Sequence, residues 1–273
     1  MSDANQRSVN YNNDIYVQSG CDIRIAEAII ICIGSFTEDL DRMISTFVQF
    51  NTFTVYKLNR FNKSEIEYYL DKVTDDCPAN VKMLFVYFSS HGRRLFTGGD
   101  ALETSDKKLI YTNDIIATFR KPNLHKKFKV FIFDTCRTKG DILFEAKSIL
   151  NQSLFNCLNL TNTKYFYETD HHVLIIWSCD IGEGAIVDEV TGSLFTQVLC
   201  DVLAKLQSGT QPKCINITEI VSDTSEAVET AIRSERQQGR DCDYQSPQCE
   251  QINMDNMDII LKRDYNFIGF KAV

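Results

Sequence analysis

The chain has 273 residues, of which 44% are hydrophobic and 24% charged, and this balance predicts one sizeable globular domain rather than a disordered or fibrous protein. A formal net charge of -8 argues against a nucleic-acid partner, because proteins that bind phosphate backbones usually carry a basic face. The polar start has no secretory signal and no apolar run approaches the ~18 residues of a membrane span, so we expect a cytoplasmic protein with no membrane contact.

Strands and helices are predicted to alternate along the chain. Runs of consecutive apolar residues indicate strands buried on both faces of a sheet, and apolar residues three or four positions apart indicate helices. In chain order, these patterns predict a strand at 28–34, a helix at 37–49, a strand at 51–58, a helix at 63–74, a strand at 83–89, a helix at 112–119, strands at 129–135 and 173–179, helices at 192–206 and 217–236, and a strand at 257–261. The expected fold is an α/β, three-layer α/β/α sandwich around a mostly parallel six-stranded sheet.

The cysteines and the irregular stretch at 140–172 indicate what kind of protein this is. Ten cysteines occur, and several lie within apolar runs, as Cys32 and Cys200 do, which favours reduced buried thiols over disulfides. The chain has no C-x-x-C pair and no spaced Cys/His quartet, so we expect no metal site. Residues 140–172 show no helix or strand period, and a connection of this length is usually functional or mobile.

His91 and Cys136 follow two of the buried strands directly. The strand at 83–89 runs into His91 and Gly92, and the strand at 129–135 runs into Cys136, 45 residues after the histidine. Active sites of parallel α/β sheets lie beyond the carboxyl ends of the strands. A free thiol is mostly protonated at neutral pH, so a nucleophilic cysteine needs a base, which His91 can supply. The backbone N–H groups of Gly92 and Cys136 are candidates for an oxyanion hole.

Taken singly, these residues have ordinary interpretations as a core thiol and a His-Gly turn. Together, in this order and at this spacing, they resemble the caspase family of cysteine peptidases. The resemblance covers residues from about 28 to 261. It is carried by SSHG (89–92), TCR (135–137), GSLFTQVLCDVL (192–203) and QSP (245–247).

The resemblance implies a cysteine endopeptidase that cleaves protein or peptide substrates in apoptosis or related signalling, without metal or cofactor. It implies a short polar N-terminal segment (1–24), a large-subunit part (25–139), an intersubunit linker (140–172) and a small-subunit part (173–273). Activation would involve cleavage in the linker, where the candidate sites are Asp141, Lys147, Lys164 and Asp170. It also implies a homodimer, or a heterodimer with another caspase, formed through the C-terminal strand.

The residues expected to bind the substrate depart from the caspase pattern. Caspases hold a substrate Asp with two arginines and a glutamine, whereas here Asp134 stands at the glutamine position and Val187 at one arginine position. The loop that carries the other arginine is missing. A carboxylate is not favourably buried against another without a cation, so Asp134 suits Arg or Lys, as in metacaspases and paracaspases. Asp180 or Glu183 could add a second acid.

Three alternatives therefore stay open. The chain is a protease with altered, basic specificity, or a protease that accepts Asp through other residues such as Arg93 or Arg94, or a caspase-like decoy that regulates a true caspase by pairing with it. Asp134 could also simply accept backbone hydrogen bonds at the end of its strand. Cys179 has no histidine placed for it and has acidic neighbours that raise a thiol pKa, so we expect it in the pocket wall.

Overall fold

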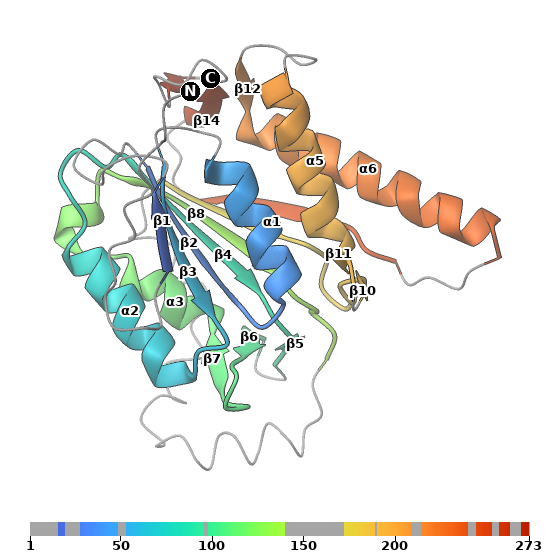
Figure 1. Ribbon diagram of the computed structural model, residues 1–273, viewed down its shortest axis with the longest axis horizontal. Coiled ribbons are helices and arrows are strands. Elements are labelled where there is room, and N and C mark those ends of the chain that lie inside the picture. Colours follow the sequence, from blue (N-terminus) through green and yellow to red (C-terminus); the bar gives the residue numbers. More distant parts are fainter. Residues whose placement is uncertain are drawn as a thin grey trace, which may run out of the picture.

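The computed structural model describes residues 16–19, 28–48, 53–95, 98–139, 172–188, 190–208, 214–239, 244–252, 257–262 and 269–272. Within them, seven strands form a central sheet in the order β1-β3-β2-β4-β8-β9-β13 (Figure 1). The strands are β1 (Tyr16–Ser19), β2 (Ala28–Gly34), β3 (Phe53–Asn59), β4 (Met83–Ser89), β8 (Phe128–Asp134), β9 (Val173–Trp177) and β13 (Gln248–Ile252). The five inner strands run parallel, and β1 and β13 pair antiparallel at the two edges.

Helices cover both faces of this sheet. One face is covered by α1 (Thr37–Val48), α5 (Leu194–Ser208) and α6 (Ile217–Gln237), and the other by α2 (Lys63–Asp75) and α3 (Thr112–Thr118), with a short 3-10 turn, η2 (Pro122–Leu124) (Figure 1). Every residue of β2, β4, β8 and β9 is buried, because alternate side chains enter opposite cores. The expected three-layer fold, with six strands and a mostly parallel sheet, is confirmed, and β1 extends it by one edge strand.

Two small antiparallel elements stand at the carboxyl edge of the sheet, one in the lower part of Figure 1 and the other to its right, at mid-height. A three-stranded sheet consists of β5 (Gly92–Arg94), β6 (Asp100–Glu103) and β7 (Leu109–Tyr111). A two-stranded ribbon consists of β10 (Val187–Asp188) and β11 (Gly192–Ser193). Their strands of two to four residues are too short to show a period in the sequence.

The prediction that residues 257–261 form the sixth strand of the central sheet is wrong. They lie in β14 (Met257–Lys262), which pairs with β12 (Cys214–Asn216) and β15 (Gly269–Ala272) in a separate sheet. The strand next to β9 is β13, whose three central residues are exposed. An edge strand does not need apolar residues on both faces, so a criterion based on apolar runs passed over it.

Among the described helices, none is long and apolar enough to cross a membrane. The linker candidates Asp141, Lys147, Lys164 and Asp170 lie outside the described residues. So do residues 1–15 and 20–24 of the N-terminal segment.

Candidate active site

The chain segments that carry His91 and Cys136 run side by side beyond the sheet. They leave neighbouring parallel strands, β4 and β8, whose last residues Ser89 and Asp134 are in register. The backbone N–H of Ser90 donates to Asp134 O (3.3 Å), and further on Arg94 N donates to Thr138 O (2.8 Å). The sequence prediction that the two residues follow adjacent strand ends is confirmed.

Gly92 is the point of closest approach between these segments. A Cβ at this position would lie 1.8 Å from Thr135 Oγ1 and 3.0 Å from Cys136 O, so only glycine fits. In the β5–β6 ladder, Glu103 N donates to His91 O (2.8 Å). Because hydrogen-bonded and non-bonded pairs alternate in antiparallel ladders, the N–H of Gly92 is directed away from β6, toward the cysteine. This direction suits an oxyanion donor.

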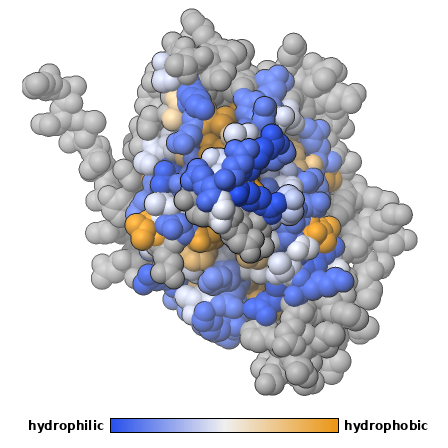
Figure 2. Space-filling view, turned by 90° about the vertical axis from the view of Figure 1, so that its right-hand side faces the viewer, coloured by the Kyte–Doolittle hydropathy of each residue, from blue (hydrophilic) through white to orange (hydrophobic). Residues whose placement is uncertain are grey.

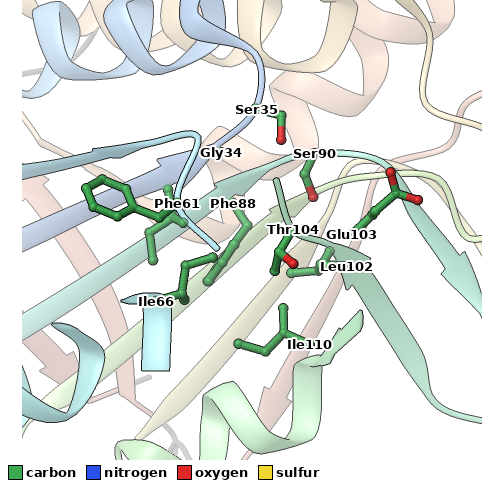
Figure 3. Close-up of a pocket in the computed structure, with 11 residues that line it drawn as sticks. Gly34, Ser35, Phe61, Ile66, Phe88, Ser90, Leu102, Glu103, Thr104 and Ile110 are labelled. Carbon is green, nitrogen blue, oxygen red and sulfur yellow. The ribbon is translucent and has the colours of Figure 1, made fainter. Parts of the chain in front are cut away.

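The His91 side chain is exposed and packs edge-to-face against Phe36, with ring centroids 5.2 Å apart. Phe36 belongs to the tight connection between β2 and α1. Behind this connection a cavity of about 10 Å³, the size of one water, is rimmed by Ser35, Ser90 and Glu103 (Figure 3). Its floor is apolar. Because the cavity holds only about one water, it is too small to receive a substrate side chain.

Cys136 is half-buried, and its sulfur contacts the segment that follows β9. The backbone N–H of Ala185 donates to Cys136 Sγ (3.3 Å). Arg137 N donates to Glu183 O (2.9 Å), and Gly182 N donates to Arg137 O (3.1 Å). The catalytic cysteine candidate is therefore held between the His91 segment on one side and residues 182–185 on the other.

Arg137, the residue after Cys136, anchors the cysteine segment to the protein interior. Its guanidinium is buried, donates to Asp100 Oδ2 (3.1 Å) and lies 4.1 Å from the centre of the Trp177 ring. Arg94 donates to the same Asp100 carboxylate (2.7 Å), and Arg93 pairs with Glu103 (3.2 Å). Both arginines beside the histidine are thus engaged in ion pairs within the small β5–β7 sheet.

The acids predicted for the substrate pocket have different surroundings. Glu183 uses its carboxylate to accept from Ser246 N (2.7 Å) and Ser246 Oγ (3.1 Å). Asp180 is exposed, and Val187 is 39% exposed on the β10–β11 ribbon. Only Asp134 is buried, at the end of β8.

Asp134 faces a second buried carboxylate, Asp39, from the first turn of α1. Thr196 Oγ1 donates to Asp134 Oδ2 (2.6 Å), while Ser193 N (2.8 Å) and Ser89 Oγ (2.6 Å) donate to Asp39. Burial, followed by the charge of Asp39, raises the pKa of Asp134 to about 6, although the surrounding hydroxyls partly oppose this. Burial also raises the pKa of Asp39 above its ordinary value.

Neither carboxylate forms an ion pair within the described part of the chain. Arg42, one turn along α1, lowers the pKa of Asp39 less than the hydrogen bonds from Ser89 and Ser193 do, and its guanidinium donates to Thr191 O (3.3 Å). Gly192, with a φ of 84°, lies over Asp39, and a Cβ there would be 2.1 Å from Asp39 Oδ1. Sequence reasoning missed Asp39 because an acid in the first turn of a helix is ordinary.

Cys179 is fully buried beneath the cysteine segment. Burial is the main cause that raises its pKa to about 12, and the charges of Cys136 and Asp134 add to it. The expected rise is therefore present, but Asp180 and Glu183 are not among its causes. Within the described residues, no group of three His, Cys, Asp or Glu side chains could hold a metal ion.

Comparisons with known proteins show the family and the fold of the chain. The family model of the caspase domain matches residues 28–257. The crystal structure of caspase-1 from Spodoptera frugiperda is 16% identical, with a TM-score of 0.61 over 84% of this chain and 88% of that one. The Drosophila initiator caspase Dronc is 15% identical, with a TM-score of 0.59 over 84% and 81%. No curated protein sequence matches the chain.

Proposed function

The chain belongs to the caspase-domain family, and on this premise we propose that it is a cysteine endopeptidase in which Cys136 is the nucleophile and His91 its acid–base partner. In this mechanism the imidazole takes the thiol proton, the thiolate attacks the scissile carbonyl, and the histidine then protonates the leaving amine. The N–H groups of Gly92 and Cys136 hold the oxyanion, each donor contributing about 3 kcal/mol. Water releases the acyl group.

The observation that carries the proposal is the close approach at Gly92. A residue without a side chain is required there because the histidine segment lies directly against Thr135 and Cys136. A turn and a core thiol with separate structural roles do not need this contact. A peptidase needs it, because the base and the oxyanion donor must both reach the carbon that the sulfur attacks.

The buried carboxylates favour a basic residue, Arg or Lys, at the cleavage site. Two carboxylates in one desolvated place repel each other, and a cation between them relieves both the repulsion and the burial cost. A substrate Asp would add a third negative charge there. Asp39 therefore takes the role of second acid that the sequence assigned to Asp180 or Glu183.

The alternative function, a catalytically impaired partner of a true caspase, is favoured by one observation. Asp39 and Asp134 are only 0% and 3% exposed, and Gly192 of the β10–β11 ribbon lies over Asp39. A substrate side chain reaches them only if this ribbon moves. A protease would move it on activation, whereas a decoy would keep it closed.

Peptide cleavage separates these functions. Purified protein is incubated with fluorogenic peptides that end in Arg, Lys or Asp, beside the variants Cys136→Ala, Asp134→Asn and Asp41→Asn. Asp41 is the matched control, because it lies on the same helix as Asp39 but is exposed and pairs with Lys57.

We expect cleavage after Arg or Lys that Cys136→Ala abolishes, that Asp134→Asn lowers at least tenfold and that Asp41→Asn leaves unchanged. Cleavage after Asp alone would refute the basic specificity and keep the protease. No cleavage of any peptide, before or after the linker is cut with an added protease, would favour the decoy.

Activation and partners are proposed on the same premise. Cleavage within 140–172 would free the segments on either side of the site, and intact-mass analysis would show the cut and its residue type. A second caspase domain would pair with β13, because β13 rather than β14 forms the edge of the central sheet. Sedimentation at several concentrations would measure this pairing. The described surface seen from the right of Figure 1 is mostly hydrophilic (Figure 2).

A further inference from the structure

A second thiol lies beside the candidate nucleophile. Phe133 of β8 is in register with Trp177 of β9, so two positions further along Thr135 stands opposite Cys179. Cys179 Sγ lies 3.2 Å from Thr135 O, the carbonyl of the peptide group that leads into Cys136. This places the sulfur within about 6 Å of the Cys136 Cα.

Both sulfurs contact the same three-residue segment. Cys179 Sγ is 3.5 Å from Glu183 O, and Cys136 Sγ is 3.3 Å from Ala185 N. Neighbouring strands are ~4.8 Å apart, and Cys136 lies one residue, a rise of ~3.3 Å, beyond the position opposite Cys179, so the two Cα atoms are about 6 Å apart. Disulfides form between Cα atoms roughly 4.4–6.8 Å apart. The backbones that carry the two cysteines are therefore spaced as a disulfide requires.

We propose that Cys179 is a resolving thiol that closes a disulfide with Cys136 when peroxide oxidises the nucleophile. In the first step the Cys136 thiolate attacks hydrogen peroxide, the O–O bond breaks, and Cys136 becomes a sulfenic acid as hydroxide leaves. In the second step the Cys179 thiolate attacks the Cys136 sulfur and the S–O bond breaks. Overall, two thiols and one peroxide become one disulfide and two water molecules.

Burial gives the two thiols different parts in this reaction. Cys136 is partly exposed and meets peroxide directly, whereas Cys179 is fully buried and stays reduced until its neighbour has reacted. With a pKa of about 12, Cys179 is a thiolate in only about one molecule in 10⁵ at pH 7.

Proximity more than offsets that small fraction. Well-oriented groups within one molecule react as if present at about 10⁵ M or more. The effective thiolate concentration is then on the order of 1 M, far above what a millimolar external thiol with a pKa of ~8.5 supplies. A thiolate of high pKa is also the stronger nucleophile.

The disulfide would switch the site off reversibly. It removes the nucleophile, and it also blocks the oxidation of sulfenic acid to sulfinic and sulfonic acids, which ordinary thiols cannot reverse. This inference rests on the proposed function only in requiring Cys136 to be a reactive thiol. Its test therefore measures the oxidation state of the cysteines and needs no peptide substrate.

The experiment treats reduced, full-length protein with a small excess of hydrogen peroxide, blocks remaining thiols with iodoacetamide, and maps peptides by mass spectrometry without reduction. Wild type is compared with Cys179→Ser and with Cys77→Ser. Serine at position 179 can keep the hydrogen bond to Thr135 O. Cys77 is the matched control, a partly buried thiol beyond the C-terminus of α2, near the amino ends of the strands and away from Cys136.

We expect a peptide linked through Cys136 and Cys179 in wild type and in Cys77→Ser, and full recovery of Cys136 alkylation after dithiothreitol. In Cys179→Ser, Cys136 should instead accumulate as sulfinic and sulfonic acid, with recovery at least tenfold lower. Absence of the linked peptide in wild type, or linkage of Cys136 to another cysteine, would overturn the inference even if Cys179→Ser does not fold. A protein that forms the disulfide but cleaves no peptide would uphold this inference and refute the proposed protease.

Discussion

Replacing Asp134 with Asn removes a buried charge from beside Asp39 while nearly preserving the shape of the side chain. The pKa of Asp134 is about 6 in the folded protein, against an ordinary value of 3.8. The folded state therefore binds this proton more tightly than the unfolded state does. Stability from the protonated carboxyl is fully present below pH 4 and is lost as the pH rises through 6.

The size of this effect follows from the shift. About two pKa units correspond to about 3 kcal/mol of destabilisation once the group is ionised, and roughly half of it develops between pH 5 and pH 8. Asn can still accept the hydrogen bond from Thr196, but its new N–H₂ group needs a partner, which subtracts about 1 kcal/mol or more. We therefore expect Asp134→Asn to be about 1–2 kcal/mol more stable than wild type at pH 8.

Urea unfolding at pH 5, 6, 7 and 8 measures this advantage, and cleavage of peptides ending in Arg is assayed on the same samples. The advantage of Asp134→Asn should shrink as the pH falls, and its peptidase activity should be at least tenfold below that of wild type at every pH. This combination is expected of a site that holds unfavourable charge for its substrate.

A stability difference that is constant across these pH values would refute the pKa argument. A variant that is less stable at every pH would mean that the carboxylate has a structural role as a hydrogen-bond acceptor. The control Asp41→Asn should show neither the pH-dependent gain nor the loss of activity, because Asp41 is exposed.

Three further substitutions test the surroundings of the site. Gly192→Ala should lower the free energy of unfolding by about 2 kcal/mol or more in urea titration, because its φ is 84° and a methyl group would strike the carboxylate beneath it. Gly92→Ala should reduce kcat/KM for the preferred peptide by about 100-fold, since the methyl group displaces the histidine segment from the cysteine; unchanged kinetics would contradict the proposed oxyanion donor. Asp100→Asn should lower the free energy of unfolding by about 3 kcal/mol, because it leaves buried Arg137 without its carboxylate. Glu229→Gln, in an exposed ion pair, should lower it by less than about 1 kcal/mol, and equal losses would contradict the burial argument.

Much of the fold could be predicted because its inner strands are buried on both faces. Such strands must be continuously apolar, so 28–34, 83–89, 129–135 and 173–179 were visible as runs of apolar residues. The same logic failed at the sheet edge. β13 has solvent-exposed residues and no apolar run, and the apolar run at 257–261 pairs in a different sheet instead.

The order of residues alone determined the helix–strand alternation and the positions of His91 and Cys136, because each follows its strand directly and parallel strands end at one edge. Only the tertiary structure decided which groups share the pocket, since Asp39 and Asp134 are 95 residues apart and meet through the packing of α1 against the sheet. It likewise decided that Glu183 holds Ser246 and that Cys179 lies against the peptide group of Cys136. These contacts depend on distances across the fold, which local sequence patterns do not encode.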